Sequence, residues 1–287
     1  MKKSTKLYIA PKLFLLIIVG NYLTFSAFSQ STEQTFAFAK EQMNAGNYQQ
    51  AALLYERMLF FDSAFVYTAQ IYPELAACYE HSNDLVNAAK QLGFAYRFAD
   101  SDGKIEILLK KAELFLLSGE TEFAYIEMLD LPEKISTSDE FRRNTMLGII
   151  HFRKQNYTDA EKYFSLCNTD KKQQFEINEC IKKAGNANKR FPKWVRYISL
   201  AVPGSAQLIY GDYKGGINSL ALVGGFTLLY MHTIKSYSLI DAWLSVFPWY
   251  IRYYQGGFEN TAEIREIKKQ AYLDKQLRII LETISKN

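Results

Sequence analysis

The sequence predicts an all-α protein in which a solenoid of helical hairpins is followed by an apolar, membrane-spanning helical segment. Three observations lead to this prediction: a pattern marked by alanine recurs four times, a run of twenty residues carries no charged side chain, and the chain begins with a basic and then apolar stretch. With 287 residues, of which 48% are hydrophobic, the chain is long enough to bury a sizeable core.

The first thirty residues have the composition of a signal peptide. Lys2, Lys3 and Lys6 precede a wholly apolar run over residues 13–19, and small residues surround Ser29. A basic start stays in the cytoplasm while the short apolar run enters the translocation channel, so the residues that follow are exported. We expect cleavage after Ser29. An uncleaved anchor is the alternative, and it exports the following residues as well.

Four copies of one two-helix pattern follow the predicted signal peptide. The stretches that begin at Gly46, Asn83, Gly119 and Gln155 align, and their shared alanines are 37, 36 and 36 residues apart. A period between about 20 and 50 residues is typical of solenoids, because one helical pair cannot bury its apolar face without a neighbour. The helix over residues 171–184 is expected to cap the end of the stack.

Each repeat is expected to pack through an alanine and a large apolar residue one helical turn later. These pairs are Ala51 with Tyr55, Ala88 with Leu92, Ala124 with Met128, and Ala160 with Phe164. The first helix of each pair carries a small residue, which lets the two helices approach closely: Ala39, Ala76, Ala112 and Gly148. The alternative is an ordinary helical bundle in which the four alanines recur by chance.

The turn and second helix of these units resemble the tetratricopeptide repeat. The best matches are Gly46-Asn47-Tyr48 with Ala51 and Tyr55, and Asn156-Tyr157 with Ala160 and Phe164. The resemblance covers roughly residues 33–167, although the period exceeds the family's usual 34 and the closing proline is missing. It implies a concave groove lined by the first helix of each unit.

The resemblance also indicates which side chains would line that groove. The candidates are Lys40, Asn44, Glu80, His81, Glu113 and Arg153. Their charges are of mixed sign, so they do not form the basic cluster that binds a peptide's terminal carboxylate. A solvated face without a ligand is the alternative.

A membrane-spanning helix is predicted from Gly215 to Ile234. These twenty residues include no Asp, Glu, Lys or Arg, and at 1.5 Å per residue they span about 30 Å. A second crossing is expected over residues 237–254, with Asp241 near one end and tryptophans and tyrosines at the membrane interface. A buried helix of a soluble core is the alternative for the first span. The chain then divides into a signal peptide (1–29), a repeat domain (30–188), a membrane-associated domain (189–257) and a C-terminal amphipathic helix (258–287).

A glycine-rich motif precedes the predicted span. Its residues are Pro203, Gly204, Gln207, Tyr210 and Gly211, followed by Asp212. This run resembles a PGxxQxxYGD-like pattern of small bacterial membrane domains, several of which are attached to tetratricopeptide proteins. Residues 254–262 are similar to the second half of that pattern. The resemblance implies location and architecture, and no activity.

The composition argues against several classes of function. A formal charge of +4 is too small to indicate a nucleic-acid partner. No nucleophile, zinc or phosphate-binding motif occurs, so we expect no enzyme activity, no cofactor and no metal. Asp100 and Asp102 imitate part of a calcium loop but lack its other ligands, which favours a turn. Cys167 and Cys180 are either a disulfide pair or two buried thiols.

These features predict a membrane-anchored scaffold of the bacterial cell envelope. Its repeats would lie in the periplasm and bind other envelope proteins, and its anchor would lie in a membrane, with the inner membrane favoured. One alternative is a component of a transport or protein-insertion machine in which the C-terminal hairpin is the working part. Another is a membrane enzyme that uses Asp241 or tyrosines. No oligomeric state is predicted.

Overall fold

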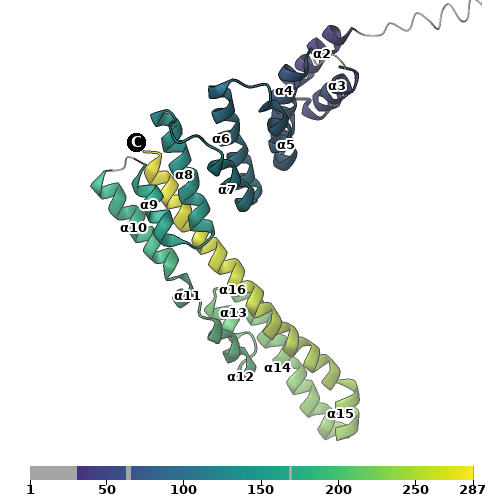
Figure 1. Cartoon of the computed structure of the whole chain (residues 1–287). Helices are drawn as coiled ribbons and strands as arrows, with labels where there is room; N and C mark the ends of the chain where they lie inside the picture. Colours follow the sequence, from purple (N-terminus) through teal and green to yellow (C-terminus); the bar gives the residue numbers. More distant parts are fainter. Residues whose placement is uncertain (1–30, 63–65, 168–169, 287) are drawn as a thin grey trace, which may run out of the picture. The chain divides into compact units, whose positions relative to one another are not determined.

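A computed structural model describes residues 31–62, 66–167 and 170–286 of the chain, and all regular structure among them is helical (Figure 1). The all-α prediction is therefore confirmed for these residues. The predicted signal peptide, residues 1–29, lies outside them. The chain divides into two compact units, residues 1–120 and 121–287, and the division falls inside the predicted repeat domain.

The first unit consists of helices that pack against one another in chain order. They are α2 (Thr32–Asn44), α3 (Tyr48–Phe61), α4 (Thr68–His81), α5 (Leu85–Ala95) and α6 (Ser101–Ser118). Gly46 and Asn83 have positive φ angles of 80° and 60°, which reverse the chain within a few residues. The Asp100 carboxylate accepts a hydrogen bond from the Gly103 amide and caps α6, so it serves a helix start.

The core of the first unit forms where the repeated alanines meet large apolar side chains. Ala51, Ala88 and Tyr55 are fully buried. The Tyr55 ring packs edge-on against Phe36 of α2, with centroids 5.9 Å apart. Ile71 belongs to the same core cluster, so α3 is packed between the helices on either side of it in the chain.

A buried carboxylate connects α3 to α4. Asp62 accepts hydrogen bonds of 2.9 Å from the amides of Val66 and Tyr67 and from the Thr68 hydroxyl. Burial by itself would raise the pKa of Asp62, but these hydrogen bonds to the charged form lower it below its ordinary value. The carboxylate therefore stabilises the folded unit when it is ionised.

Asp62→Asn is expected to destabilise the first unit by about 1 to 3 kcal/mol at neutral pH, because two backbone amides and the buried Thr68 hydroxyl lose a charged acceptor. The folded pKa lies below the unfolded value, so this contribution is complete above pH ~4 and is lost as pH falls through the folded pKa. Urea unfolding of both proteins at several pH values, followed by circular dichroism, measures the difference. An equal difference at pH 3 and pH 7 would contradict the assignment, and Asp102→Asn, at an exposed carboxylate, is the control.

The second unit contains the last repeats and the predicted membrane segment. Its elements are α7 (Thr121–Leu129), α8 (Thr137–Arg153), α9 (Tyr157–Ser165), α10 (Lys171–Gly185), α11 (Ala187–Arg190), the 3-10 helix η1 (Lys193–Tyr197), α12 (Ile198–Ala201), α13 (Ser205–Ile209), α14 (Tyr213–Ser236), α15 (Leu239–Ser245) and α16 (Phe247–Ile284). Helices α7 to α10 pack consecutively. A Cβ atom on Gly148 of α8 would lie 2.5 Å from the Phe164 ring of α9, so the small residue makes room for the large one.

Helix α16 packs against two parts of the second unit. Its first part lies along α14, and its last turns pack against α10 (Figure 1). Leu277 and Ile280 of α16 share one core cluster with Ile177 and Ile181 of α10. Helix α10, predicted to cap the stack, is thus itself covered by α16. Cys167 and Cys180 are free, buried thiols in this cluster.

The continuous helix α16 also changes how the C-terminal third is divided. The predicted boundary between residues 257 and 258 falls inside α16, because the helix has no proline after Pro248 and no break near its glycine pair. The predicted second crossing over residues 237–254 is split between α15 and the start of α16. Ser238 caps α15, and the split lies at Val246, which α16 follows directly.

Candidate functional site: the C-terminal helical hairpin

Gly204 of the glycine-rich motif allows two backbone segments to touch. Its φ angle is +86°, in the left-handed region, and a Cβ atom there would lie 2.3 Å from the Gly216 carbonyl oxygen. On the opposite side of this contact, a Cβ atom on Gly216 would lie 2.6 Å from Leu208. Only glycine fits both positions, so the motif sets how closely the α13 region approaches α14.

The polar motif residues hold this region to the rest of the unit. The Gln207 amide donates a 3.3 Å hydrogen bond to the Gly257 carbonyl of α16, and the Tyr210 hydroxyl donates a 2.7 Å hydrogen bond to the Pro192 carbonyl. Asp212 caps α14 by accepting from the Gly215 amide at 3.2 Å. Gln207 and Tyr210 are buried. The structure therefore brings the two halves of the sequence motif together across α14 and α16.

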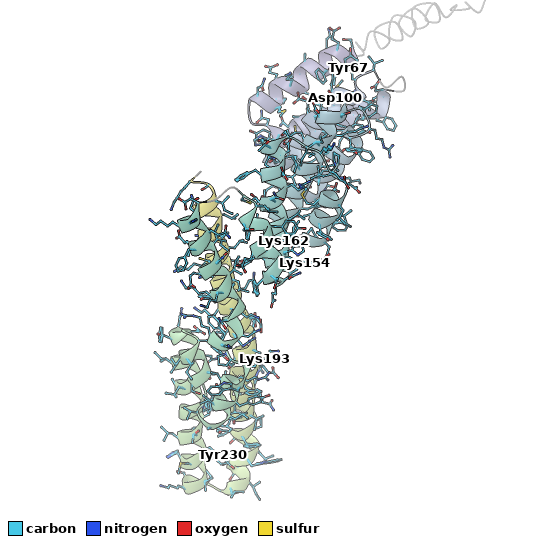
Figure 2. All side chains as sticks on the ribbon, turned by 60° about the vertical axis from the view of Figure 1, so that its left-hand side comes forward. Tyr67, Asp100, Lys154, Lys162, Lys193 and Tyr230 are labelled. Carbon is cyan, nitrogen blue, oxygen red and sulfur yellow. The ribbon has the colours of Figure 1, made fainter. Side chains whose placement is uncertain are left out.

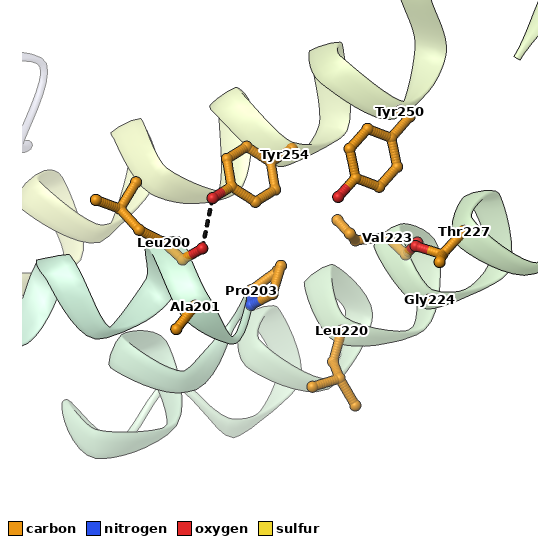
Figure 3. Close-up of a pocket in the computed structure, with 9 residues that line it drawn as sticks. All are labelled: Leu200, Ala201, Pro203, Leu220, Val223, Gly224, Thr227, Tyr250 and Tyr254. Carbon is orange, nitrogen blue, oxygen red and sulfur yellow. Dashed lines mark hydrogen bonds between the residues drawn. The ribbon is translucent and has the colours of Figure 1, made fainter. Parts of the chain in front are cut away.

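A small cavity, lined mostly by residues with apolar side chains, lies on one side of the hairpin that α14 and α16 form (Figure 3). It has a volume of about 380 Å³ and lies between Val223 and Gly224 of α14 and the rings of Tyr250 and Tyr254 of α16. The Tyr254 hydroxyl donates a 2.5 Å hydrogen bond to the Leu200 carbonyl at its edge. This hydrogen bond connects α16 to α12.

A second cavity of the hairpin has several polar side chains in its lining. It has a volume of about 370 Å³, and its lining includes Gln207, Asn218, Ser219, Arg252 and Asn260. The side-chain oxygens of Gln207 and Ser219 are buried without a hydrogen-bond partner among the described residues. Unsatisfied buried oxygens are rare and point to a polar occupant such as water or a ligand group.

The outer surface of the hairpin is apolar. Among the described residues, α14 is the one helix whose length and composition suit a bilayer span, and little of its apolar stretch is buried. Its exposed large side chains include Ile217, Leu228 and Met231. Trp243 and Trp249 are exposed at the far end, near the α15 turn. Asp241 in that turn accepts a hydrogen bond from Ser238 and is exposed.

Charged groove candidates of the first unit form ion pairs between alternate helices. Lys40 Nζ of α2 lies 3.8 Å from Glu74 of α4, and Lys110 Nζ of α6 lies 2.7 Å from Glu80 and 3.5 Å from Glu113. Burial alone would lower the pKa of Lys110, but its hydrogen bond to Glu80 and the charges of both carboxylates raise it. The first helices thus share a mixed-charge edge.

Each of the other groove candidates lies at the end of a helix. The His81 ring stacks on Tyr48 with centroids 4.4 Å apart, beside the turn between α2 and α3. Asn44 is exposed at the end of α2, and Arg153 is exposed at the end of α8 in the second unit. The eight predicted repeat-packing residues, by contrast, are all buried.

Two arginines of α16 that line cavities of the second unit were not among the predicted site residues. Arg252 lies in the predicted second crossing, and a charge within an aromatic-rich run is itself a signal for a functional position. Arg265 is 4% exposed in α16 and donates a 2.7 Å hydrogen bond to the Phe191 carbonyl. Nothing local in the sequence distinguishes it from the exposed basic residues that follow.

No family model, curated protein or solved structure matches the chain. Its function is therefore inferred from the residues and their geometry.

Proposed function

We propose that the chain is a membrane-anchored scaffold of tetratricopeptide-like repeats that binds other proteins in the bacterial cell envelope. The observation that carries this proposal is the surface of α14, which leaves its apolar side chains exposed over the length that a bilayer requires. A soluble helix of this composition would bury that face. Helices α2 to α6 pack consecutively within the first unit, and α7 to α10 do so within the second, with the repeated alanines buried. This packing supports the repeat assignment within each unit, and such stacks provide extended binding surfaces.

The course of the hairpin supports a topology with two crossings. Tyr230 of α14 packs near Phe247 of α16 at one end, and Ser219 lies against Gly257 toward the other. The two helices are therefore antiparallel, and the chain leaves the hairpin on the side where it entered. Helix α10 and the end of α16, which pack together, lie on that side. With an exported repeat domain, this side is the periplasm and the anchor lies in the inner membrane.

An exposed aromatic patch in the first unit is a suitable surface for a protein partner. We define it as Leu53, Phe60, Phe61 and Val66, each of which is at least 66% exposed. The rings of Phe60 and Phe61 pack edge to face, 5.0 Å apart. Adjacent exposed apolar side chains of this size are typical of binding sites, where buried aromatic residues contribute much of the affinity.

Replacing Phe60 by a photoreactive phenylalanine analogue in cells is expected to give a specific crosslinked adduct after irradiation. The same analogue at Lys90, an exposed position of α5, is the matched control and is expected to give none. Immunoblotting detects the adducts, and mass spectrometry identifies the partner. Identical adducts from both positions, or none from any residue of the aromatic patch, would contradict partner binding through this surface.

The cavity lined by Asn218, Arg252 and Asn260 favours a second candidate function, that of a component of a transport or protein-insertion machine. Asn218, Arg252 and Asn260 place hydrogen-bonding groups on a hairpin that also exposes many large apolar side chains, and polar groups inside a membrane commonly mark a translocation path. This candidate predicts crosslinks from position 218 to a translocated protein, and their loss in Arg252→Leu. The scaffold predicts that Arg252→Leu leaves the adducts from position 60 unchanged.

A further inference from the structure

Three cationic side chains and one carboxylate line a cavity where the hairpin joins the rest of the second unit. The cavity has a volume of about 280 Å³ and is lined by Lys193, Arg196, Tyr197, Ala262, Arg265 and Glu266. Figure 2 shows Lys193 near the end of the hairpin that adjoins α10, whereas Tyr230 lies near the opposite end. The cavity therefore lies at the level where the apolar exterior begins.

Arg196 is positioned by aromatic rings and has no anionic partner among the described residues. Its guanidinium carbon lies 4.5 Å from the Phe258 ring centroid and 5.6 Å from that of Tyr197. Its Nε atom is buried and makes no hydrogen bond to any described residue. Such a donor, held by stacking with its hydrogen-bonding capacity unused, is suited to a planar or tetrahedral oxyanion.

The side chains that line the cavity carry a net charge of two positive units, because only one of the three cations is paired with a carboxylate. Arg265 is already paired with Glu266, and it also donates a 3.2 Å hydrogen bond to Asn188. Lys193 is exposed, and neither Lys193 nor Arg196 forms an ion pair within the described part of the chain. Because two cations remain, the cavity favours an anion and disfavours a group that carries its own ammonium.

The surroundings of the cavity match the headgroup level of a bilayer. Trp194 and Tyr197 are 62% and 59% exposed beside it, and amphipathic rings of this kind are enriched at membrane interfaces. Exposed Leu200 and Val202 follow directly along the chain. We propose that Lys193 and Arg196 bind the phosphate of an anionic phospholipid and so fix the depth of the hairpin. This inference rests on the proposed membrane anchor.

Native mass spectrometry of the full chain in a nonionic detergent tests the site. Phosphatidylglycerol and phosphatidylcholine with the same acyl chains are added separately, and the dissociation constants are compared. We expect the wild-type protein to prefer phosphatidylglycerol. Each lost charge is expected to weaken phosphatidylglycerol binding about fivefold, so Lys193→Gln/Arg196→Gln loses about 25-fold. Glu266→Gln is expected to strengthen it.

Three controls separate a built site from general charge attraction. Lys189→Gln removes an exposed charge from the same basic stretch without touching the cavity, and it is expected to change binding less than twofold. Arg196→Lys keeps the charge but loses the stacked, planar guanidinium, so it is expected to weaken phosphatidylglycerol binding, whereas general charge attraction would leave binding unchanged. Lys193→Gln alone alters an exposed side chain, so its effect is not a loss of core packing. Equal losses in Lys189→Gln and Lys193→Gln would overturn the proposal.

Two further outcomes distinguish the source of the phosphate and the failure of the anchor. If inorganic phosphate at millimolar concentration displaces phosphatidylglycerol completely, the site takes a soluble anion and the lipid assignment is wrong. Extraction of membranes with alkaline carbonate tests the anchor separately. A wild-type protein that resists extraction but shows no lipid preference overturns only the headgroup site, whereas a protein released by carbonate overturns the anchor.

Discussion

Replacing Phe164 by alanine is expected to destabilise the packing of α8, α9 and α10 by about 3 to 5 kcal/mol, the usual cost of deleting a buried phenylalanine ring. The side chain is fully buried and belongs to the core cluster that joins these helices to the end of α16. Hydrogen–deuterium exchange followed by mass spectrometry measures the free energy of opening for each of these helices. Exchange in the first unit serves as the internal control.

Gly148 provides a matched test of the same contact. Gly148→Ala in the wild-type background is expected to cost about 1 to 3 kcal/mol, because the new Cβ atom would lie 2.5 Å from the Phe164 ring. In the Phe164→Ala background the ring is gone, so the same change should stabilise α8 by up to about 1 kcal/mol through helix propensity. The effect of one substitution therefore reverses sign. Additive effects would show that the two residues do not pack as described.

Gly204→Ala is expected to destabilise the hairpin by about 2 to 5 kcal/mol, combining about 1 to 2 for a left-handed backbone with about 1 to 3 for overpacking. The obstacle is the Gly216 carbonyl oxygen, and backbone cannot move aside as a side-chain tip can. The three tryptophans of the chain, Trp194, Trp243 and Trp249, all lie in this region. Their fluorescence during denaturation in detergent therefore reports on the hairpin.

Two other glycines separate the causes of this effect. Gly211 has a φ angle of +81°, but a Cβ atom there would meet no atom within 4 Å, so Gly211→Ala should show only the backbone cost. Gly224 lies within α14 and has equally open space, so Gly224→Ala should be neutral or slightly stabilising. We expect Gly224→Ala to be the most stable of the three variants, Gly211→Ala to be intermediate and Gly204→Ala to be the least stable. Equal losses at 211 and 204 would exclude the close backbone contact.

Local patterns were sufficient to predict the helices of the repeats and the apolar helix. The alanine spacing placed Ala51, Ala88, Ala124 and Ala160 in a helical pattern, and all four are fully buried. The predicted span 215–234 lies inside α14 because an uncharged helical run is a property of consecutive residues. These features depend on periodicity and composition, which a single sequence contains in full.

The contacts that hold the hairpin to the rest of the second unit could not be predicted, because they join residues that are far apart in the sequence. Gln207 meets Gly257, and Arg265 meets Phe191, across 50 and 74 positions of the chain. The spacing of neither pair has a helical or strand period. The stacking of Arg196 on Phe258 is of the same kind, since it requires η1 to lie beside α16. In the sequence, only their charge distinguishes Asp241 and Arg252 from the apolar residues around them.

In the proposed anchor, the length of α16 would set the distance between the lipid and the last predicted repeats. Its 38 residues extend about 57 Å, and the portion from Glu259 to Ile284 accounts for about 39 Å of that. One end of this rod belongs to the hairpin and the other is packed into α10. In that arrangement, a protein bound to the last predicted repeats would be held at a fixed distance from the bilayer, whereas a flexible linker would leave this distance variable.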